Sequence, residues 1–437
     1  MKILITGLAL SRNLGAPAMA LSLIAEVTKR LPQATFVMAV SSADMKQEKE
    51  WFDYYNNIGF KIDKLVPRST ITSYLINVLP IKKMYQYITG KYKLPAYKKQ
   101  KNSRFWLQQH SDYLDAIKES DLIISMFGIS YIGDGVHKFT DGLNDYSSIY
   151  YAKKYGIPYT RFTQSYGPFD DKMIRYFAKK EFDYLPFVYA RGKHSASYCR
   201  EITKDKSKVY DIPDLAVLLK KADDSWTNKY LEGMGLNKKD YIVVSPSSVI
   251  YSMPKRVTGS IGEKHVESIS LIVKTLIEQG NKILLLPHMY SDKKWACDRE
   301  ICYKVFEKLS NTEKHTTRIV EEDIDTLQAK SLISFSKLSI VSRYHALVAA
   351  VSTSTPVITI GWNIKYYDLM EYYDIEEMSI DTRENEPLEI MNKTLEKMKF
   401  YEEKTNVLRY NKMKKNVEKI VETSVENLCH WIENETR

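Results

Sequence analysis

Cysteine is scarce in this sequence, and the few cysteines do not form pairs. Cys199, Cys297, Cys302 and Cys429 show no C-x-x-C or C-x-x-H spacing. Such isolated cysteines are typical of reduced thiols in a cytosolic protein, and they predict neither a disulfide framework nor a zinc site. An H-E-x-x-H pattern is also missing, so we expect no bound metal.

Long apolar runs and a leader segment are missing as well. No apolar stretch approaches the length of 18 residues that a membrane-spanning helix needs. Residues 1–6 pass straight into a strand pattern, without a charged segment, an apolar segment and a cleavage site. We therefore expect a soluble, cytoplasmic protein.

The charge balance favours anionic partners, although no nucleic-acid motif accompanies it. The formal net charge is +10, and much of the excess lies between Lys61 and Arg104 and near the C-terminus. Such a balance suits phosphorylated small molecules or an anionic membrane surface. With no motif for nucleic acid, we expect none as a partner.

The length and the order of elements predict two domains. A chain of 437 residues with 44% apolar content is long enough for two hydrophobic cores. Short apolar strands alternate with helical patterns in both halves, which predicts an α/β protein with two doubly wound Rossmann-like domains facing a cleft. We place the domains at 1–218 and 219–437, with a linker around 220–228 and a helical tail over 387–437.

A basic and aromatic segment, 61–110, interrupts the first domain. Its interleaved tyrosine, leucine and lysine residues are compatible with an insertion that covers the sheet while the lysines stay in water. They are also compatible with contact to a membrane interface or a lipid carrier. The sequence therefore leaves open a peripheral location at the inner face of the membrane.

The most informative segment lies near the end of the second domain. An apolar strand pattern, 338–341, is followed by Ser342, Arg343 and His345 and then by a small-residue helix pattern. The carboxyl end of a strand beside a helix N-terminus is where open α/β sheets bind ligands, and anions are favoured there. A surface arginine and a helix-capping histidine are the simpler interpretation.

Polar residues follow the other predicted strands in the same way. In the second domain, His288 and Asp292 follow the strand at 282–286. In the first domain, the candidate residues stand at the ends of predicted strands or in the loops that follow them. They are Asn13, Gly15, Asp134, Gln164, Tyr166 and Arg191. No G-x-G-x-x-G fingerprint is present, so ordinary turns explain the glycines equally well.

Taken in order, several segments resemble one known family. They are N-L-G at 13–15, D-L-I-I-S at 121–125, Q-S-Y-G-P at 164–168, A-R-G-K-H-S at 190–195, I-P-D-L-A at 212–216, L-L-L-P-H at 284–288 and S-R-Y-H-A-L at 342–347. Over roughly residues 1–370 the chain resembles the polysaccharide pyruvyl transferases. Ala16, Phe127 and Ile129 depart from the family pattern, which has an acidic residue or glycines there.

The resemblance implies a glycosyltransferase-B-like fold and the transfer of pyruvate from phosphoenolpyruvate to a sugar or lipid-linked glycan as a ketal, in cell-surface polysaccharide biosynthesis. Phosphoenolpyruvate is then a co-substrate, and no cofactor is expected. A guanidinium fork suits its carboxylate and phosphate. We therefore assign phosphoenolpyruvate binding to Arg343 and Arg191, together with Ser342. Histidine suits proton transfer near neutral pH. His345 is therefore the expected acid and base, with His288 in reserve.

The remaining candidates are assigned to the sugar acceptor. They are Asn13, Gly15, Asp134, Gln164, Tyr166 and Asp292, the last of which is also expected to orient His288. Two other functions remain open. A nucleotide-sugar glycosyltransferase of the same fold would use a carboxylate such as Asp368 or Glu371 on the ribose. A non-catalytic glycan-assembly or membrane-scaffold component would keep the fold alone.

Overall fold

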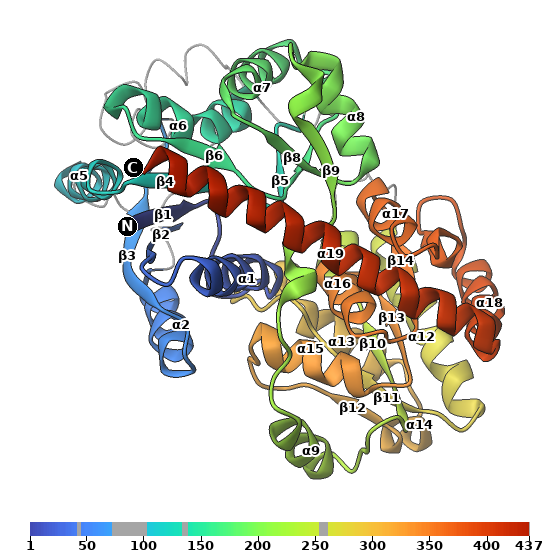
Figure 1. The fold of residues 1–437 in the computed structure, drawn as a ribbon. Coiled ribbons are helices and arrows are strands. Elements are labelled where there is room, and N and C mark those ends of the chain that lie inside the picture. Colours follow the sequence, from blue (N-terminus) through green and yellow to red (C-terminus); the bar gives the residue numbers. More distant parts are fainter. Residues whose placement is uncertain (42–44, 72–102, 133–138, 253–260, 437) are drawn as a thin grey trace, which may run out of the picture. The chain divides into compact units, whose positions relative to one another are not determined.

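The computed structural model describes residues 1–41, 45–71, 103–132, 139–252 and 261–436 (Figure 1). The chain divides into two compact units. Unit 1 comprises residues 1–11, 23–212 and 425–437, and unit 2 comprises residues 12–22 and 213–424. Each unit is built around a parallel sheet.

Five described strands form the main sheet of unit 1, in the order β3-β2-β1-β4-β6. Every neighbouring pair is parallel. Their bounds are β1 Lys2–Thr6, β2 Thr35–Ser41, β3 Ile62–Arg68, β4 Leu122–Ser125 and β6 Tyr159–Arg161. Two smaller parallel pairs are β5 (Ile129–Ser130) with β7 (Ser165–Tyr166) and β8 (Val188–Arg191) with β9 (Val209–Ile212).

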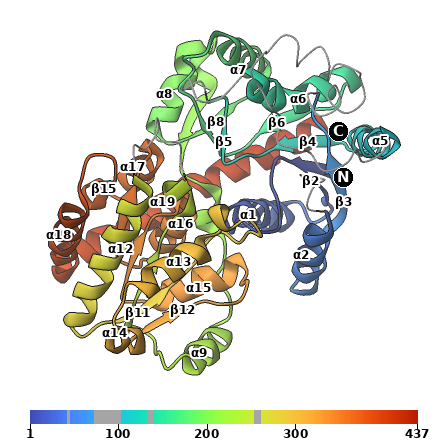
Figure 2. The same ribbon diagram turned by 180° about the vertical axis from the view of Figure 1, so that it is seen from behind.

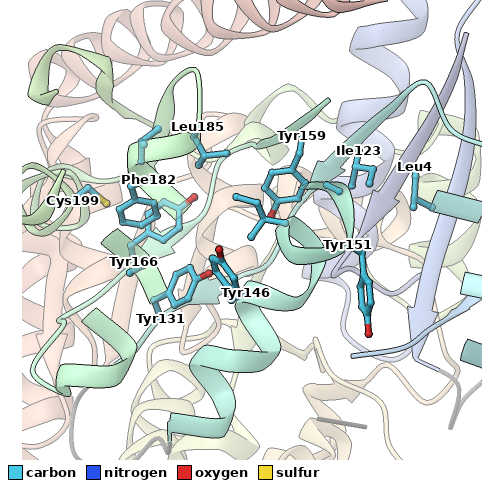
Figure 3. Close-up of a cluster of buried hydrophobic side chains, with 14 of the residues drawn as sticks. Leu4, Ile123, Tyr131, Tyr146, Tyr151, Tyr159, Tyr166, Phe182, Leu185 and Cys199 are labelled. Atoms are coloured by element: carbon cyan, nitrogen blue, oxygen red, sulfur yellow. The ribbon is translucent and has the colours of Figure 1, made fainter. Parts of the chain in front are cut away.

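Helices and aromatic side chains complete unit 1. The helices are the second half of α1 (Gly15–Arg30), α2 (Met45–Asn57), α5 (Ser103–Lys118), α6 (Phe139–Tyr155), α7 (Lys172–Tyr184), α8 (Lys193–Ile202), η2 (Lys206–Lys208) and the end of α19 (Lys404–Glu435). In the core, Phe182 packs against Tyr166 and Tyr131 with ring centroids 4.9 and 6.0 Å away (Figure 3). This aromatic packing joins α7 to β7 and to the loop after β5.

Six described strands form the sheet of unit 2, in the order β12-β11-β10-β13-β14-β15, and all pairs are parallel. Figure 2 shows β11, β12 and β15 of this sheet from behind. Their bounds are β10 Tyr241–Ser245, β11 Lys282–Leu285, β12 Thr317–Ile319, β13 Leu338–Val341, β14 Val357–Gly361 and β15 Ser379–Asp381. This is the Rossmann order, in which the direction of strand addition reverses between β10 and β13.

Helices cover the sheet of unit 2 because its central strands are buried on both faces. Alternate strand residues such as Ile242 and Val244 join a core with side chains of α12, α13 and α18. The helices are η3 (Leu215–Leu218), α9 (Asp224–Gly233), α10 (Ser248–Ser252), α12 (Ile261–Glu278), η4 (Lys294–Ala296), α13 (Asp298–Glu307), α14 (Asn311–His315), α15 (Thr326–Phe335), α16 (Tyr344–Ser352), α17 (Ile364–Glu371), η5 (Glu376–Met378), α18 (Pro387–Met398), η6 (Lys399–Glu402) and most of α19.

The structure differs from the predicted organisation in three places. The segment 61–110 is not one insertion, because β3 is an edge strand of the main sheet and α5 begins at residue 103; residues 72–102 lie outside the described part. The predicted linker around 220–228 contains the start of α9. The compact units change over between residues 212 and 213, and residues 12–22 and 425–437 belong to the opposite unit from the one predicted.

Candidate active site

The loops after β10, β11 and β13 meet at the point where the strand order of unit 2 reverses. Backbone hydrogen bonding joins two of them, because Ser342 N–H donates to the carbonyl of Ser245 at 2.8 Å. In open parallel sheets this reversal opens a crevice at the carboxyl ends of the strands, where ligands bind. The predicted residues Ser342, Arg343 and His288 therefore lie at one edge of one sheet.

Arg343 stands directly before α16, and its guanidinium pairs with the buried carboxylate of Asp298. Nε donates to Oδ2 at 2.7 Å, and Nη2 donates to Oδ1 at 2.5 Å. Nη2 also donates to the hydroxyl of Ser248 at 2.9 Å. Burial alone would lower the pKa of Arg343, but the charge of Asp298 outweighs it and raises the pKa. Arg343 therefore stays a cation.

This pairing corrects the expected role of Arg343 as a free fork for phosphoenolpyruvate. Nε and Nη2 are committed to Asp298 and Ser248, and only Nη1 has no hydrogen-bond partner among the described residues. Ser342 lies beside it and is fully buried, and its hydroxyl also has no partner among the residues that the structure describes. An anion at this edge would therefore meet Nη1, not a bidentate fork.

Asp298 organises the loops around Arg343. Besides the guanidinium, it accepts hydrogen bonds from the backbone N–H of Ser248 at 2.7 Å and of His288 at 3.2 Å. It begins α13 and is fully buried. One carboxylate thus holds together the loops after β10, β11 and β13.

His288 is buried and neutral. Its Nδ1 lies 3.4 Å from the hydroxyl of Ser245. Burial lowers the pKa of His288 to about 3, with a further lowering by the charges of Arg343 and His345 that Asp298 opposes. A histidine with such a low pKa carries no proton to donate near pH 7. The reserve role of general acid therefore does not suit His288, although it can accept hydrogen bonds.

His345 is the second residue of α16 and meets a second buried carboxylate. Its Nε2 lies 3.5 Å from Oδ2 of Asp214, which is fully buried. Gly15 lies on the other side of the ring, and a Cβ atom added there would be only 2.0 Å from Nδ1. The imidazole is therefore confined between Asp214 and the start of α1.

A small cavity in unit 2 brings the two histidines together with a lysine. It is lined by Leu14, Ala18, Ala216, Leu219, His288, Thr326, Lys330, His345, Val348 and Ala349. Lys330 is buried, and its Nζ donates to the carbonyls of Ala216, Val217 and Leu219 at 3.4, 3.3 and 2.5 Å. The cavity is thus apolar, with two imidazoles and one internally bonded ammonium group in its wall.

The loop before α1 borders this site through its backbone. Leu14 N–H donates to the carbonyl of His288 at 3.2 Å, and Asn13 forms an antiparallel bridge with Met289. Asn13 Oδ1 accepts a hydrogen bond from Gly15 N–H at 3.0 Å and so begins the helix. The two residues predicted to bind the acceptor, Asn13 and Gly15, therefore lie next to the histidines.

Asp292 does not take its predicted place beside His288. Its side chain is 92% exposed and pairs with Arg12 at 3.2 Å. Because the Asp292 carboxylate faces solvent and Arg12, the expectation that Asp292 orients His288 is wrong. The loop from Tyr290 onward carries Asp292 to the surface.

The other predicted residues lie in unit 1. Arg191 ends β8, and its guanidinium donates to the hydroxyl of Ser165 at 3.1 Å and to the carbonyl of Gly128. Gln164 is fully buried. Its amide accepts from Ser130 and Arg161 at 2.8 and 3.1 Å and donates to the carbonyl of Ser125 at 3.2 Å.

The roles predicted for Gln164 and Tyr166 as acceptor-binding residues change accordingly. Because internal bonds use both ends of its amide, Gln164 supports the loops and is not placed to bind a sugar. Tyr166 is buried, with its ring against Phe182, so it belongs to the core. Asp134 lies outside the described residues.

Sequence reasoning missed the buried groups that hold the predicted ones. They are Asp214, Ser248, His265, Asp298 and Lys330. His265 accepts a hydrogen bond from the backbone N–H of Ser247 at 3.2 Å, and burial lowers its pKa to about 4. Asp214 stands inside I-P-D-L-A, one of the segments that carry the family resemblance, but we assigned it no role in the site. The segments around the other four carry no motif.

Metal sites and membrane-spanning helices are not found among the described residues. Within the described ranges, no group of three or more His, Cys, Asp or Glu side chains is arranged to hold a metal ion. Among the described helices, none is both long and apolar enough to cross a membrane.

Comparison with solved structures places the fold in a known class. UDP-GlcNAc 2-epimerase from Neisseria meningitidis bound to UDP-GlcNAc is similar with a TM-score of 0.59 and 11% identity, covering 98% of this chain and 99% of that one. UGT89C1 from Arabidopsis thaliana complexed with quercetin has a TM-score of 0.56 and 8% identity, with 99% of each chain covered. The chain has the glycosyltransferase-B fold of two Rossmann-like domains, as predicted.

The sequence itself defines the family more closely. Residues 13–364 match the family described as polysaccharide pyruvyl transferase. The chain belongs to that family, which confirms the predicted resemblance.

Proposed function

We propose that this protein transfers pyruvate from phosphoenolpyruvate to two hydroxyl groups of a glycan and forms a ketal. Membership of the family supports pyruvyl transfer in general. One structural observation supports the donor: the charged pair Arg343–Asp298 and the start of α16 lie together where the strand order reverses. An anion bound there would meet Nη1 of Arg343 and the N–H groups of the first helical turn.

The proposed reaction balances without an oxidant or a reductant. The methylene carbon of phosphoenolpyruvate takes up a proton and becomes a methyl group, while the first acceptor hydroxyl oxygen bonds to C2. The bond between C2 and the phosphate oxygen then breaks, and its electron pair leaves with the phosphate. The second hydroxyl oxygen bonds to C2 and closes the ketal. The two acceptor hydroxyls lose two protons in total. One balances the proton taken up by the methylene carbon, and the other leaves with the phosphate.

His345 is the residue to which we assign the proton transfers. Each step moves a proton near neutral pH, for which an imidazole is suited. His288 is too weak a base to hold a proton at that pH, since burial lowers its pKa to about 3. His345 lines the same cavity, so we assign to it the role that the low pKa of His288 does not suit.

The donor is tested by substituting Arg343. Arg343→Lys keeps a positive charge beside Asp298 but removes Nη1, so the buried carboxylate is not left without a cation. Phosphoenolpyruvate at about 100 times its dissociation constant should stabilise the wild type by roughly 2.7 kcal/mol. We expect Arg343→Lys to lose most of this shift in a melting experiment. Arg383→Lys, in a more exposed pair with Asp381, is the matched control and should keep it.

The product is tested separately. Incubation with phosphoenolpyruvate and a glycan panel should release one phosphate for each ketal methyl group seen by NMR. Stabilisation by nucleotide sugars alone would instead favour a glycosyltransferase. Binding to anionic vesicles with no response to phosphoenolpyruvate would favour a non-catalytic component. Either result would overturn the proposal.

A further inference from the structure

A buried carboxylate is placed to control the imidazole of His345. Asp214 is fully buried and stands before η3, where its Oδ1 accepts a hydrogen bond from Ala216 N–H at 2.8 Å. Its other oxygen, Oδ2, lies 3.5 Å from Nε2 of His345. A buried carboxylate is stable only with donors or cations around it. Oδ1 has the N–H group of Ala216 as its donor, and Oδ2 faces His345.

Lys330 holds the segment that carries Asp214. Its Nζ donates to the carbonyls of Ala216, Val217 and Leu219, which belong to η3 or directly follow it. An ammonium group has three hydrogens, and these carbonyls use all three. Lys330 is therefore an anchor for η3 and is not placed to bind a substrate or to form an imine.

Gly15 fixes the plane of the imidazole. A Cβ atom built there would lie 2.0 Å from Nδ1, and 2.5 and 2.6 Å from the ring carbons Cγ and Cε1 on either side of it. Such short and nearly equal distances to both carbons place that atom over the ring face, not in the ring plane. The backbone of Gly15 therefore packs on the face of the ring and leaves the in-plane direction of Nδ1 to other groups.

We propose that Asp214 is a positioning residue that keeps the neutral His345 protonated on Nε2, so that Nδ1 is the nitrogen that exchanges protons with the substrate. The negative charge of Oδ2, 3.5 Å from Nε2, favours an N–H group at Nε2 and repels a lone pair there. When Nδ1 takes the proton of an acceptor hydroxyl, the imidazolium that forms is stabilised by Asp214, which stays ionised. This inference rests on the proposed function for the identity of the substrate.

The tautomer can be measured on the wild-type protein. The chain has eight histidines, so 15N-histidine labelling gives few resonances, and His345→Gln identifies the one of interest. We expect the neutral ring of His345 to carry its proton on Nε2. A neutral ring protonated on Nδ1 would overturn the proposal, whether or not any substituted protein folds.

Asp214→Asn tests the consequence for turnover. Asparagine keeps an oxygen for Ala216 N–H but removes the charge. We expect kcat to fall on the order of 100-fold, while KM for phosphoenolpyruvate changes by less than about 3-fold. The control is Asp223→Asn, at an exposed residue that caps α9 through Ser225 N–H at 2.8 Å, and it should change neither constant.

The two proposals fail in different ways. An unchanged kcat in Asp214→Asn, or equal losses in kcat and in affinity for phosphoenolpyruvate, would overturn the positioning role. If the wild type forms no ketal, the proposed function fails, but the NMR comparison still decides the role of Asp214. In that comparison, Asp214→Asn should move the neutral ring of His345 away from pure Nε2 protonation, and an unchanged spectrum would contradict the positioning role.

Discussion

Two buried carboxylates determine how the predicted side chains of unit 2 are presented. Asp298 binds the guanidinium of Arg343, and Asp214 faces the imidazole of His345. Both carboxylates are fully buried, whereas 16% of the side chain of each partner is exposed. Arg343 and His345 are therefore available to a ligand, whereas the two carboxylates are not. In each pair, one residue can contact the ligand and the other can only position its partner.

Asp298→Asn should destabilise the protein strongly. The substitution leaves the largely buried guanidinium of Arg343 without its counter-charge, which typically costs about 3–5 kcal/mol. Asp381→Asn is the matched control, because its pair with Arg383 is much more exposed and should contribute less than about 1 kcal/mol. Urea unfolding measures both. Similar small losses in the two proteins would show that Arg343 does not depend on Asp298.

Gly15→Ala should displace His345. The added methyl group would overlap the ring at 2.0 Å, and such overpacking typically costs about 1–3 kcal/mol. We expect a lower free energy of unfolding together with a loss of turnover. In Gly233→Ala, a methyl group at the end of α9 meets nothing within 4 Å, so this control should be neutral or slightly stabilised. Full activity of Gly15→Ala would contradict the packing described.

The residues of the site were predictable only where the signal was local. Arg343 and His345 stand in one short segment after an apolar strand, so the sequence places them at a sheet edge. Their partners come from far along the chain, and Asp298 stands 45 positions before Arg343. An aspartate in a helical segment carries no sign of its partner. The same holds for Lys330, whose acceptors are backbone carbonyls and leave no trace in the side-chain pattern.

At the scale of elements, burial decides which strands the sequence reveals. β13 has the predicted bounds, 338–341, because a strand buried on both faces is a continuous apolar run. β3 was missed, since it is an edge strand with Asp63 and Lys64 exposed and Pro67 inside it. β9 was missed because it is short and exposes Tyr210.

Lys330→Met tests how α15 holds η3. Burial lowers the pKa of Lys330 to about 7, and the charge of Lys414 lowers it further, whereas Glu418 and Asp214 oppose the shift. Since an unfolded lysine has a pKa of about 10.4, the unfolded state binds more protons between these values. From this group, the free energy of unfolding therefore rises with pH above 7, by up to about 1.4 kcal/mol per unit.

We expect Lys330→Met to lack this rise. Urea unfolding of both proteins between pH 7 and about 9 measures this rise. It is taken as the difference between the two proteins, because cysteines exposed by unfolding lose their protons near a pKa of about 8.5. The variant should also turn over more slowly if η3 no longer holds Asp214 in place. Equal pH slopes for the two proteins would contradict the lowered pKa of Lys330.

At the scale of the whole molecule, buried histidines make stability depend on acid. Burial lowers the pKa of His288 to about 3 and that of His265 to about 4, against about 6.5 when unfolded. Between pH 6.5 and 4 the unfolded state therefore gains two more protons. Burial raises the pKa of Asp145 to about 6, so the folded state gains one. The unfolded state therefore binds one proton more than the folded state, which favours unfolding as the pH falls.

We expect the free energy of unfolding to fall by about 1.4 kcal/mol per pH unit between pH 6 and 4 from these groups. Urea unfolding at several pH values gives the slope. His265→Gln keeps an acceptor for Ser247 N–H and should reduce the slope by about one proton. An unchanged slope in His265→Gln would mean that His265 is protonated in the folded state.

The assignment of residues 12–22 and 425–437 to units 2 and 1 has a consequence for synthesis. A ribosome delivers the chain from its N-terminus, yet unit 1 includes the buried side chains of Val425, Leu428 and Ile432. Unit 1 therefore waits for residues 425–437 to emerge, while residues 12–22 wait for the rest of unit 2. A nascent chain halted after residue 212 would expose apolar surface, and it would depend on chaperones until the rest arrived.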